Sequence, residues 1–174
     1  MRAIKHTPLI AVHFVVYALL WWLSGAPMAG MAAVFALLLV WISCRDFAIF
    51  EVPDLAAVLL MASGIGLAFD WVWALVGAMV WAGVFLLVQR GAQLAMGRPA
   101  LGLGDVKLIA GVGAWLGPVA PIYVTLFASL GAIAALLALT ALRREKIGDL
   151  AGTGIAFGPF LCLSAWAVWL RGVA

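Results

Sequence analysis

Two aspartates stand beside long apolar runs, where a carboxyl group is costly to place. Asp46 follows one run in VWISCRDFAIFEVPD, and Asp105 lies between two glycines and another run in LGLGDVKLIAGVGAWLG. Charged groups at membrane depth usually line a cavity or pair with another group. Two carboxyls held close in a site of low dielectric do not both ionise, so they share a proton. Such a pair can activate water and protonate a leaving nitrogen, which is the acid–base chemistry of peptide hydrolysis.

Asp105 also has a simpler interpretation, because an aspartate at a helix N-terminus accepts backbone hydrogen bonds and suits the helix dipole. That role does not require Gly102 and Gly104, which remove side chains, permit a positive φ and let another backbone approach closely. We therefore expect the two glycines to shape a place where an extended peptide lies beside the carboxylate.

No other set of residues competes for catalysis. His6 and His13 have no carboxylate or cysteine beside them in the sequence, and two cysteines, Cys44 and Cys162, are too few for a disulfide framework or a four-thiolate zinc site. We expect no metal and no cofactor, and we interpret the cysteines as apolar packing residues. The net charge of +3 is spread over loops, which predicts no nucleic-acid partner.

The elements that carry these aspartates must lie in a membrane. Of the 174 residues, 68% are hydrophobic and 10% are charged, whereas a soluble domain has about 25% charged residues. The apolar runs are continuous rather than alternating, which favours helices over barrel strands. The predicted fold class is an all-α integral membrane protein, a polytopic bundle of seven transmembrane helices over residues 8–24, 28–44, 54–69, 71–89, 105–117, 119–142 and 155–170.

The first and fifth apolar runs each have an unusual feature. The first run resembles a secretory signal peptide, but as a retained helix it preserves the charge distribution described next. The fifth run, 105–117, spans only ~20 Å as a helix, less than the ~30 Å hydrocarbon core. We expect its Asp105 end to lie in a crevice that water can enter.

Charges and tryptophans orient the bundle. With a cytoplasmic N-terminus, nine of the ten basic residues fall on the cytoplasmic side, as the positive-inside rule requires, and only Arg171 falls outside. Asp46 and Asp105 then share the cytoplasmic face, while Asp70 lies in an outer loop. Indoles prefer the headgroup level, and seven tryptophans fall near the predicted outer ends: Trp21, Trp22, Trp71, Trp73, Trp115, Trp166 and Trp169.

The GLGDVK stretch resembles the GxGD-x-K signature of the type IV prepilin peptidases, membrane aspartyl proteases that cut leader peptides from pilin-like precursors. DFAIFEVPD is similar to the family's earlier motif, in which a proline and then Asn or Asp follow the first aspartate; here these residues are Asp46, Pro53 and Asp54. LIAGVGAWLG and GIAFGPFLCL also resemble family segments. The resemblance implies that Asp46 and Asp105 are the catalytic pair and that Gly102 and Gly104 shape the second motif.

The same resemblance implies a place in the cell and a domain plan. Family members act in the bacterial inner membrane and cut the basic leader at its cytoplasmic face. Residues 28–174 would form the six-helix peptidase domain, with 1–27 as an additional N-terminal transmembrane helix. No CxxC motif is present, so we expect the short, peptidase-only branch without N-methyltransferase activity. The sequence does not specify the oligomeric state.

The loop after the first aspartate departs from the basic, polar loop that is usual in the family. It reads FAIFEV, and we hypothesise that Phe47, Ile49 and Phe50 enter the membrane interface while Glu51 and Asp54 attract the basic leader. Lys107 has two open roles, as an electrostatic partner near the site or as a cytoplasmic anchor whose ammonium reaches the headgroups.

Two other functions remain open. The two acids could carry protons or cations in a small ion-coupled transporter subunit, although we find no inverted repeat between the halves. Alternatively, the chain could be a membrane scaffold in a secretion assembly, with the acids as helix caps.

Overall fold

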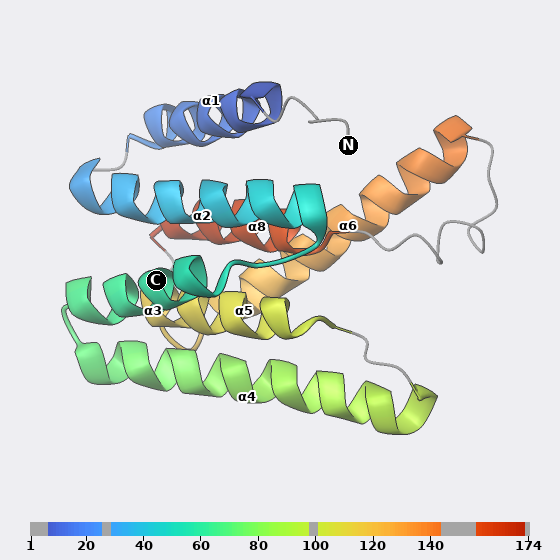
Figure 1. Cartoon of the computed structure of the whole chain (residues 1–174). Coiled ribbons are helices and arrows are strands. Elements are labelled where there is room, and N and C mark those ends of the chain that lie inside the picture. The colour runs from blue at the N-terminus through green and yellow to red at the C-terminus, as the bar shows by residue number, and fades with distance from the viewer. Residues whose placement is uncertain (1–6, 26–28, 98–100, 144–155, 173–174) are drawn as a thin grey trace.

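The computed structural model describes residues 7–25, 29–97, 101–143 and 156–172, and helices joined by short loops are the regular structure of these residues. Each predicted run corresponds to one helix (Figure 1). The helices are α1 Thr7–Ser24, α2 Ala29–Ile49, α3 Asp54–Leu67, α4 Trp71–Met96, α5 Leu103–Leu116, α6 Pro121–Arg143 and α8 Gly158–Leu170.

Three helices contain segments that are long and apolar enough to cross a membrane: Gly30–Ile49, Trp71–Met96 and Pro121–Leu142. Many large apolar side chains point outward, among them Met79 and Leu87 on α4. Water would oppose so much exposed apolar surface, whereas lipid tails do not. The prediction of an all-α, polytopic membrane protein is confirmed.

Several helix ends differ from the predicted ones. The second helix continues past residue 44 to Ile49, and the fourth continues past residue 89 to Met96. Hydropathy falls at Arg45 and at Arg90, before these helices end, because a polar residue lowers the local hydropathy without ending the helical backbone. The true ends are residues of positive φ, Phe50 and Gly97. Asp46 therefore belongs to the last turns of α2 rather than following it.

The short α5 lies at the centre of the bundle. It packs between α3 and α4 and also contacts α6 and α8, and most of its side chains are buried. Gly113 of α5 faces Gly77 of α4, where a Cβ on either residue would overlap backbone atoms of the other helix. Two opposed glycines let helix backbones come this close, so α4 and α5 form the most tightly joined pair at that point.

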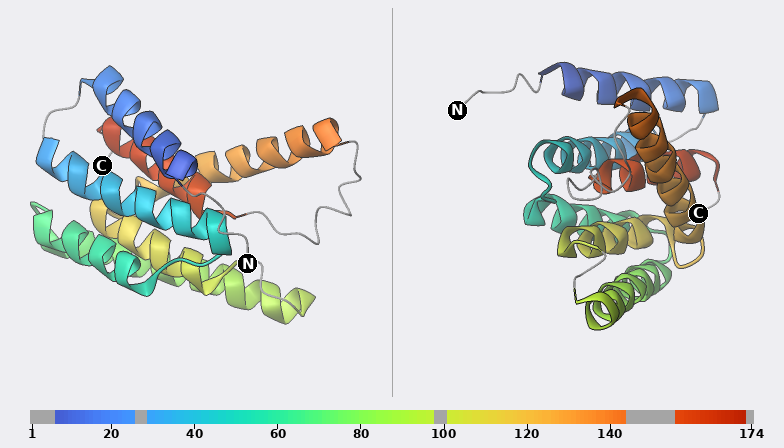
Figure 2. Two further views of the ribbon diagram at one scale, coloured as in Figure 1. Left: turned by 45° about the horizontal axis from the view of Figure 1, so that its top comes forward. Right: turned by 90° about the vertical axis from the view of Figure 1, so that its right-hand side faces the viewer.

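The other helices lie around this centre. α2 and α8 lie side by side above α3 and α5, α1 covers them, and α4 lies on the opposite side of the bundle (Figures 1 and 2). The second half of α6 diverges from the bundle in both figures. Hydrogen bonds between α1 and the bundle include Trp166 Nε1 donating to Tyr17 O at 3.1 Å, and His13 Nε2 lies 2.9 Å from Ser43 Oγ.

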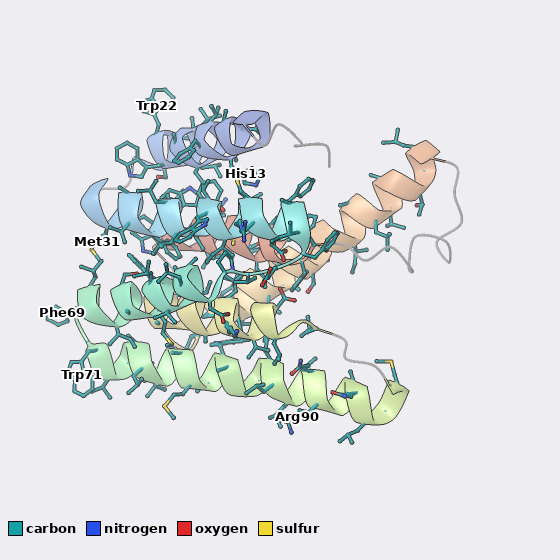
Figure 3. The ribbon with its side chains drawn as sticks, viewed as in Figure 1. His13, Trp22, Met31, Phe69, Trp71 and Arg90 are labelled. Carbon is teal, nitrogen blue, oxygen red and sulfur yellow. The ribbon has the colours of Figure 1, made fainter. Side chains whose placement is uncertain are left out.

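The two ends of the bundle differ in composition. The described basic residues Arg45, Arg90 and Lys107 lie toward the end where α2 and α4 finish and α5 begins, whereas Arg171 follows α8 at the other end. Figure 3 shows Arg90 toward the first end and Trp22, Phe69 and Trp71 at the second. Other basic residues used in the orientation argument, namely Arg2, Lys5, Arg98, Arg144 and Lys146, lie outside the described residues.

Two of the seven tryptophans assigned to the outer ends point into the bundle. Trp166 is buried and stacks on Trp169 with ring centroids 5.3 Å apart. Trp115 donates through Nε1 to Leu60 O at 2.9 Å and stacks on Phe35 at 4.5 Å. Their indole N–H groups found partners inside the bundle, which sequence position alone does not reveal.

Candidate active site

A pocket of about 310 Å³ lies where α2 ends and where α3 and α5 begin. It brings together both motifs singled out in the sequence, although they are more than fifty residues apart. All but one of the predicted site residues line it, the exception being Pro53. The lining residues are Asp46, Phe50, Glu51, Val52, Asp54, Gly102, Leu103, Gly104, Asp105 and Lys107.

Asp46 is held at the inner end of this pocket and is only 7% exposed. A carboxylate in the last turns of α2 faces the negative end of that helix dipole, which is unfavourable. The first turn of α8 compensates, because the backbone N–H of Gly158 donates to Asp46 Oδ2 at 3.0 Å. Asp46 thus accepts from one of the N–H groups at the α8 N-terminus, which lack a partner within their own helix.

Sequence reasoning missed Gly158, as it missed Val52 and Leu103 of the pocket wall. A Cβ at this position would lie 2.6 Å from Asp46 Oδ2, so only glycine leaves room for the carboxylate. The available signal was the Gly-Pro pair in GIAFGPF, because proline is common in the first turn of a helix and Pro159 indeed lies there. That signal marks a helix start but does not name the carboxylate that the helix meets.

Asp105 lies in the first turn of α5 and is partly buried. This position suits the positive end of the helix dipole, as the capping interpretation expected. The helix begins two residues earlier than predicted, at Leu103, and Gly102 rather than Asp105 is its N-cap. The carboxyl also lines the pocket that contains Asp46. Asp105 therefore has the favourable dipole position without being the N-cap, and it also lines the pocket.

The two glycines before Asp105 act differently from the prediction. Neither has a positive φ, and Gly102 is extended, with φ −71° and ψ 151°. A Cβ on Gly104 would lie 3.0 Å from Val52 Cγ2, so this glycine lets the loop before α3 pack against α5. A Cβ on Gly102 would meet Asp105 Oδ2 at an ordinary 3.7 Å. Close packing, and not backbone conformation, explains Gly104.

Lys107 pairs with Asp54 across the mouth of the pocket. Its Nζ lies 2.5 Å from Asp54 Oδ1, and both side chains are exposed. The same two residues line an adjoining apolar pocket of about 360 Å³, whose other walls are Ala57, Val58, Met61, Ala82, Val106 and Ala110. Of the two roles left open for Lys107, the structure favours an electrostatic partner, and that partner is Asp54.

The loop between α2 and α3 contributes in three ways. Glu51 is exposed and lines the pocket. Pro53 is the N-cap of α3, and its carbonyl accepts from Ala57 N at 3.0 Å, so its role is to start that helix. Of the three exposed apolar residues, Phe47, Ile49 and Phe50, only Phe50 lines the pocket.

No group of three or more His, Cys, Asp or Glu among the described residues is arranged to hold a metal ion.

Comparisons with known proteins agree with the motifs. Residues 33–139, which include Asp46 and Asp105, match the model of the type IV leader peptidase family. The prepilin leader peptidase/N-methyltransferase of Escherichia coli (strain K12) is 34% identical over 131 residues, covering 71% of this chain and 55% of that protein. The prepilin leader peptidase/N-methyltransferase of Pectobacterium carotovorum is 32% identical over 147 residues, covering 82% of this chain and 51% of that protein.

The chain thus spans about half the length of these two curated relatives. No solved structure matches it significantly. The family match covers more than half of the chain and contains both aspartate motifs. The protein belongs to the type IV leader peptidase family.

Proposed function

We propose that this protein is a membrane-embedded aspartyl endopeptidase that removes the basic leader peptide from pilin-like precursors. The observation that carries the proposal is that Asp46 and Asp105, one from each family motif, line the same pocket. The matched relatives are named as prepilin leader peptidases. We propose peptidase activity alone, because Cys44 and Cys162, the two cysteines within residues 1–174, form no CxxC pair.

The proposed chemistry uses the two carboxyls as one unit. They share a proton, and the ionised member takes a proton from water as that water attacks the scissile carbonyl. The protonated member polarises the carbonyl oxygen and then protonates the leaving nitrogen. The Gly158 N–H holds Asp46 Oδ2 in place, which leaves the other oxygen of that carboxyl for water.

The proposal places the pocket at the cytoplasmic face of the bacterial inner membrane, with the N-terminus in the cytoplasm. Supporting this orientation, Arg45, Arg90 and Lys107 lie toward the pocket end of the bundle, and basic residues are retained on the cytoplasmic side. We further propose that 1–27 is a helix outside the peptidase domain of 28–174. The family match begins at residue 33, which supports that division.

A cleavage assay tests the function. The purified protein in detergent would meet a pilin-like precursor with a basic leader and a Gly–apolar junction. We expect the wild type to cut it and Asp46→Asn and Asp105→Asn each to lose activity. Asp70→Asn is the matched control, because Asp70 caps α4 at the opposite end of the bundle through Val72 N and Trp73 N.

The contrary results separate the alternatives. Full activity in Asp46→Asn or in Asp105→Asn would mean that the altered aspartate is not catalytic. An inactive wild type, with all three variants folded, would contradict the peptidase and favour the transport interpretation, for which proton or sodium flux is the next measurement.

A further inference from the structure

Phe50 holds a backbone conformation that large side chains rarely adopt. Its φ is 55°, and among the described residues it is the only one other than glycine with a positive φ. It ends α2, with its N–H donating to Asp46 O at 2.8 Å. Helices commonly end on such a left-handed residue, but glycine usually fills the position because a Cβ is strained there. A phenylalanine is a marked exception.

Packing within the protein does not account for this exception. The Phe50 side chain is 62% exposed, so burial of its ring does not offset the strain. Residues held in strained conformations concentrate at functional sites, where the strained geometry aims a side chain. Here the left-handed turn places Phe50 in the lining of the pocket that contains Asp46 and Asp105. Phe47, one turn earlier on α2 and 56% exposed, does not line it.

The rest of the lining indicates what the ring contacts. The pocket wall contains four acids and Lys107, and its apolar members are Phe50, Val52 and Leu103. Val52 is buried, which leaves Phe50 and Leu103 as the exposed apolar surface. Within this pocket, a peptide with its scissile bond at the carboxyls would therefore meet exposed apolar side chains at these two residues, and Phe50 is the aromatic one.

We infer that Phe50 is a specificity-determining residue, whose ring contacts the apolar side chain on the carboxyl-terminal side of the scissile bond. The inference rests on the proposed function. It also revises the hypothesis for the FAIFEV loop, because it assigns Phe50 to the substrate and leaves Phe47 and Ile49 to the membrane interface.

Four proteins and two substrates test this contact. The proteins are the wild type, Phe50→Gly, Phe50→Leu and the control Phe47→Ala. The substrates are a precursor with phenylalanine directly after the junction glycine and the same precursor with alanine there. Removing one apolar side chain from such a contact lowers kcat/KM by roughly 10- to 100-fold. We expect the wild type and Phe47→Ala to prefer the phenylalanine substrate over the alanine substrate by this factor. Phe50→Leu should show a smaller preference, and Phe50→Gly should show none.

Thermal unfolding separates this role from a structural one. Glycine fits the left-handed conformation, so Phe50→Gly should unfold at the same temperature as the wild type or higher while losing its preference. An unchanged preference in Phe50→Gly would overturn the inference. So would equal losses on both substrates in Phe50→Gly and Phe47→Ala, because that result would assign both rings to membrane anchoring. A wild type that cuts neither precursor would instead overturn the proposed function on which the inference rests.

Discussion

The ammonium of Lys107 lies 2.5 Å from Oδ1 of Asp54 and joins the N-terminal part of α5 to the first turn of α3. The pair lines both the candidate active-site pocket and the apolar pocket beside it. Lys107 therefore offsets the charge of Asp54, one of the two acids expected to attract a basic leader. Glu51, which is exposed in the same pocket, is the better candidate for that attraction.

Lys107→Met should change stability little and Lys107→Glu should reduce cleavage. An exposed ion pair contributes about 1 kcal/mol or less to the free energy of unfolding, so Lys107→Met should shift thermal unfolding in detergent only slightly. Lys107→Glu adds a like charge to a pocket that already holds four acids. The double variant Asp54→Lys/Lys107→Glu restores the pair and should recover activity. A double variant no better than Lys107→Glu would argue against the pairing.

Gly158→Ala should disturb the candidate site directly. The added methyl group would lie 2.6 Å from Asp46 Oδ2, and overpacking of this kind costs about 1–3 kcal/mol. Either α8 or the carboxyl must move, so we expect precursor cleavage to be lost at a temperature where the variant remains folded. Gly83→Ala on α4 is the control, because a Cβ there meets nothing within 4 Å. Equal cleavage by the two variants would refute a positioning role for Gly158.

Gly113→Ala should destabilise the fold more than Gly158→Ala does. The new Cβ would overlap the backbone of Gly77, and backbone yields less readily than a side chain. The expected measurement is a lower unfolding temperature than that of Gly158→Ala, with Gly91→Ala as the control because its Cβ would have open space. Comparable unfolding temperatures for the Gly113 and Gly91 variants would show that α4 and α5 can separate without loss.

Trp166→Phe should loosen α1 while keeping the aromatic packing. The substitution deletes the donor to Tyr17 O, and one such hydrogen bond contributes about 1 kcal/mol. Hydrogen exchange should quicken in Thr7–Ser24. Trp81→Phe deletes a comparable bond to Pro118 O, at 2.9 Å, far from α1, and should leave α1 exchange unchanged. If both variants exchange alike in α1, the Trp166 bond does not hold that helix.

Hydropathy was sufficient to predict the helices but not their ends. The run before Arg45 predicted an end at residue 44, yet α2 continues to Ile49, because Arg45 and Asp46 interrupt the apolar run without ending the helix. The order of the helices predicted that Asp46 and Asp105 lie at the same end of the bundle, and both line one pocket there. Chain order alternates the helix ends, so both aspartates had to lie at the same end of the bundle.

Contacts between residues far apart in the chain could not be predicted from the sequence. The Lys107–Asp54 pair joins residues 53 apart, and the Gly158–Asp46 bond joins residues 112 apart. Both depend on how helices rotate about their axes when they pack, which a hydropathy profile does not encode. The inward direction of Trp115 and Trp166 was not predictable for the same reason.

The Gly158–Asp46 bond also imposes an order on the assembly of the site during synthesis. The ribosome releases α2 with Asp46 first, α5 with Asp105 later, and α8 with Gly158 after both. An elongating chain in the membrane therefore carries both carboxyls before it carries the group that holds one of them in place. The pocket reaches its final geometry only after the last described helix has inserted.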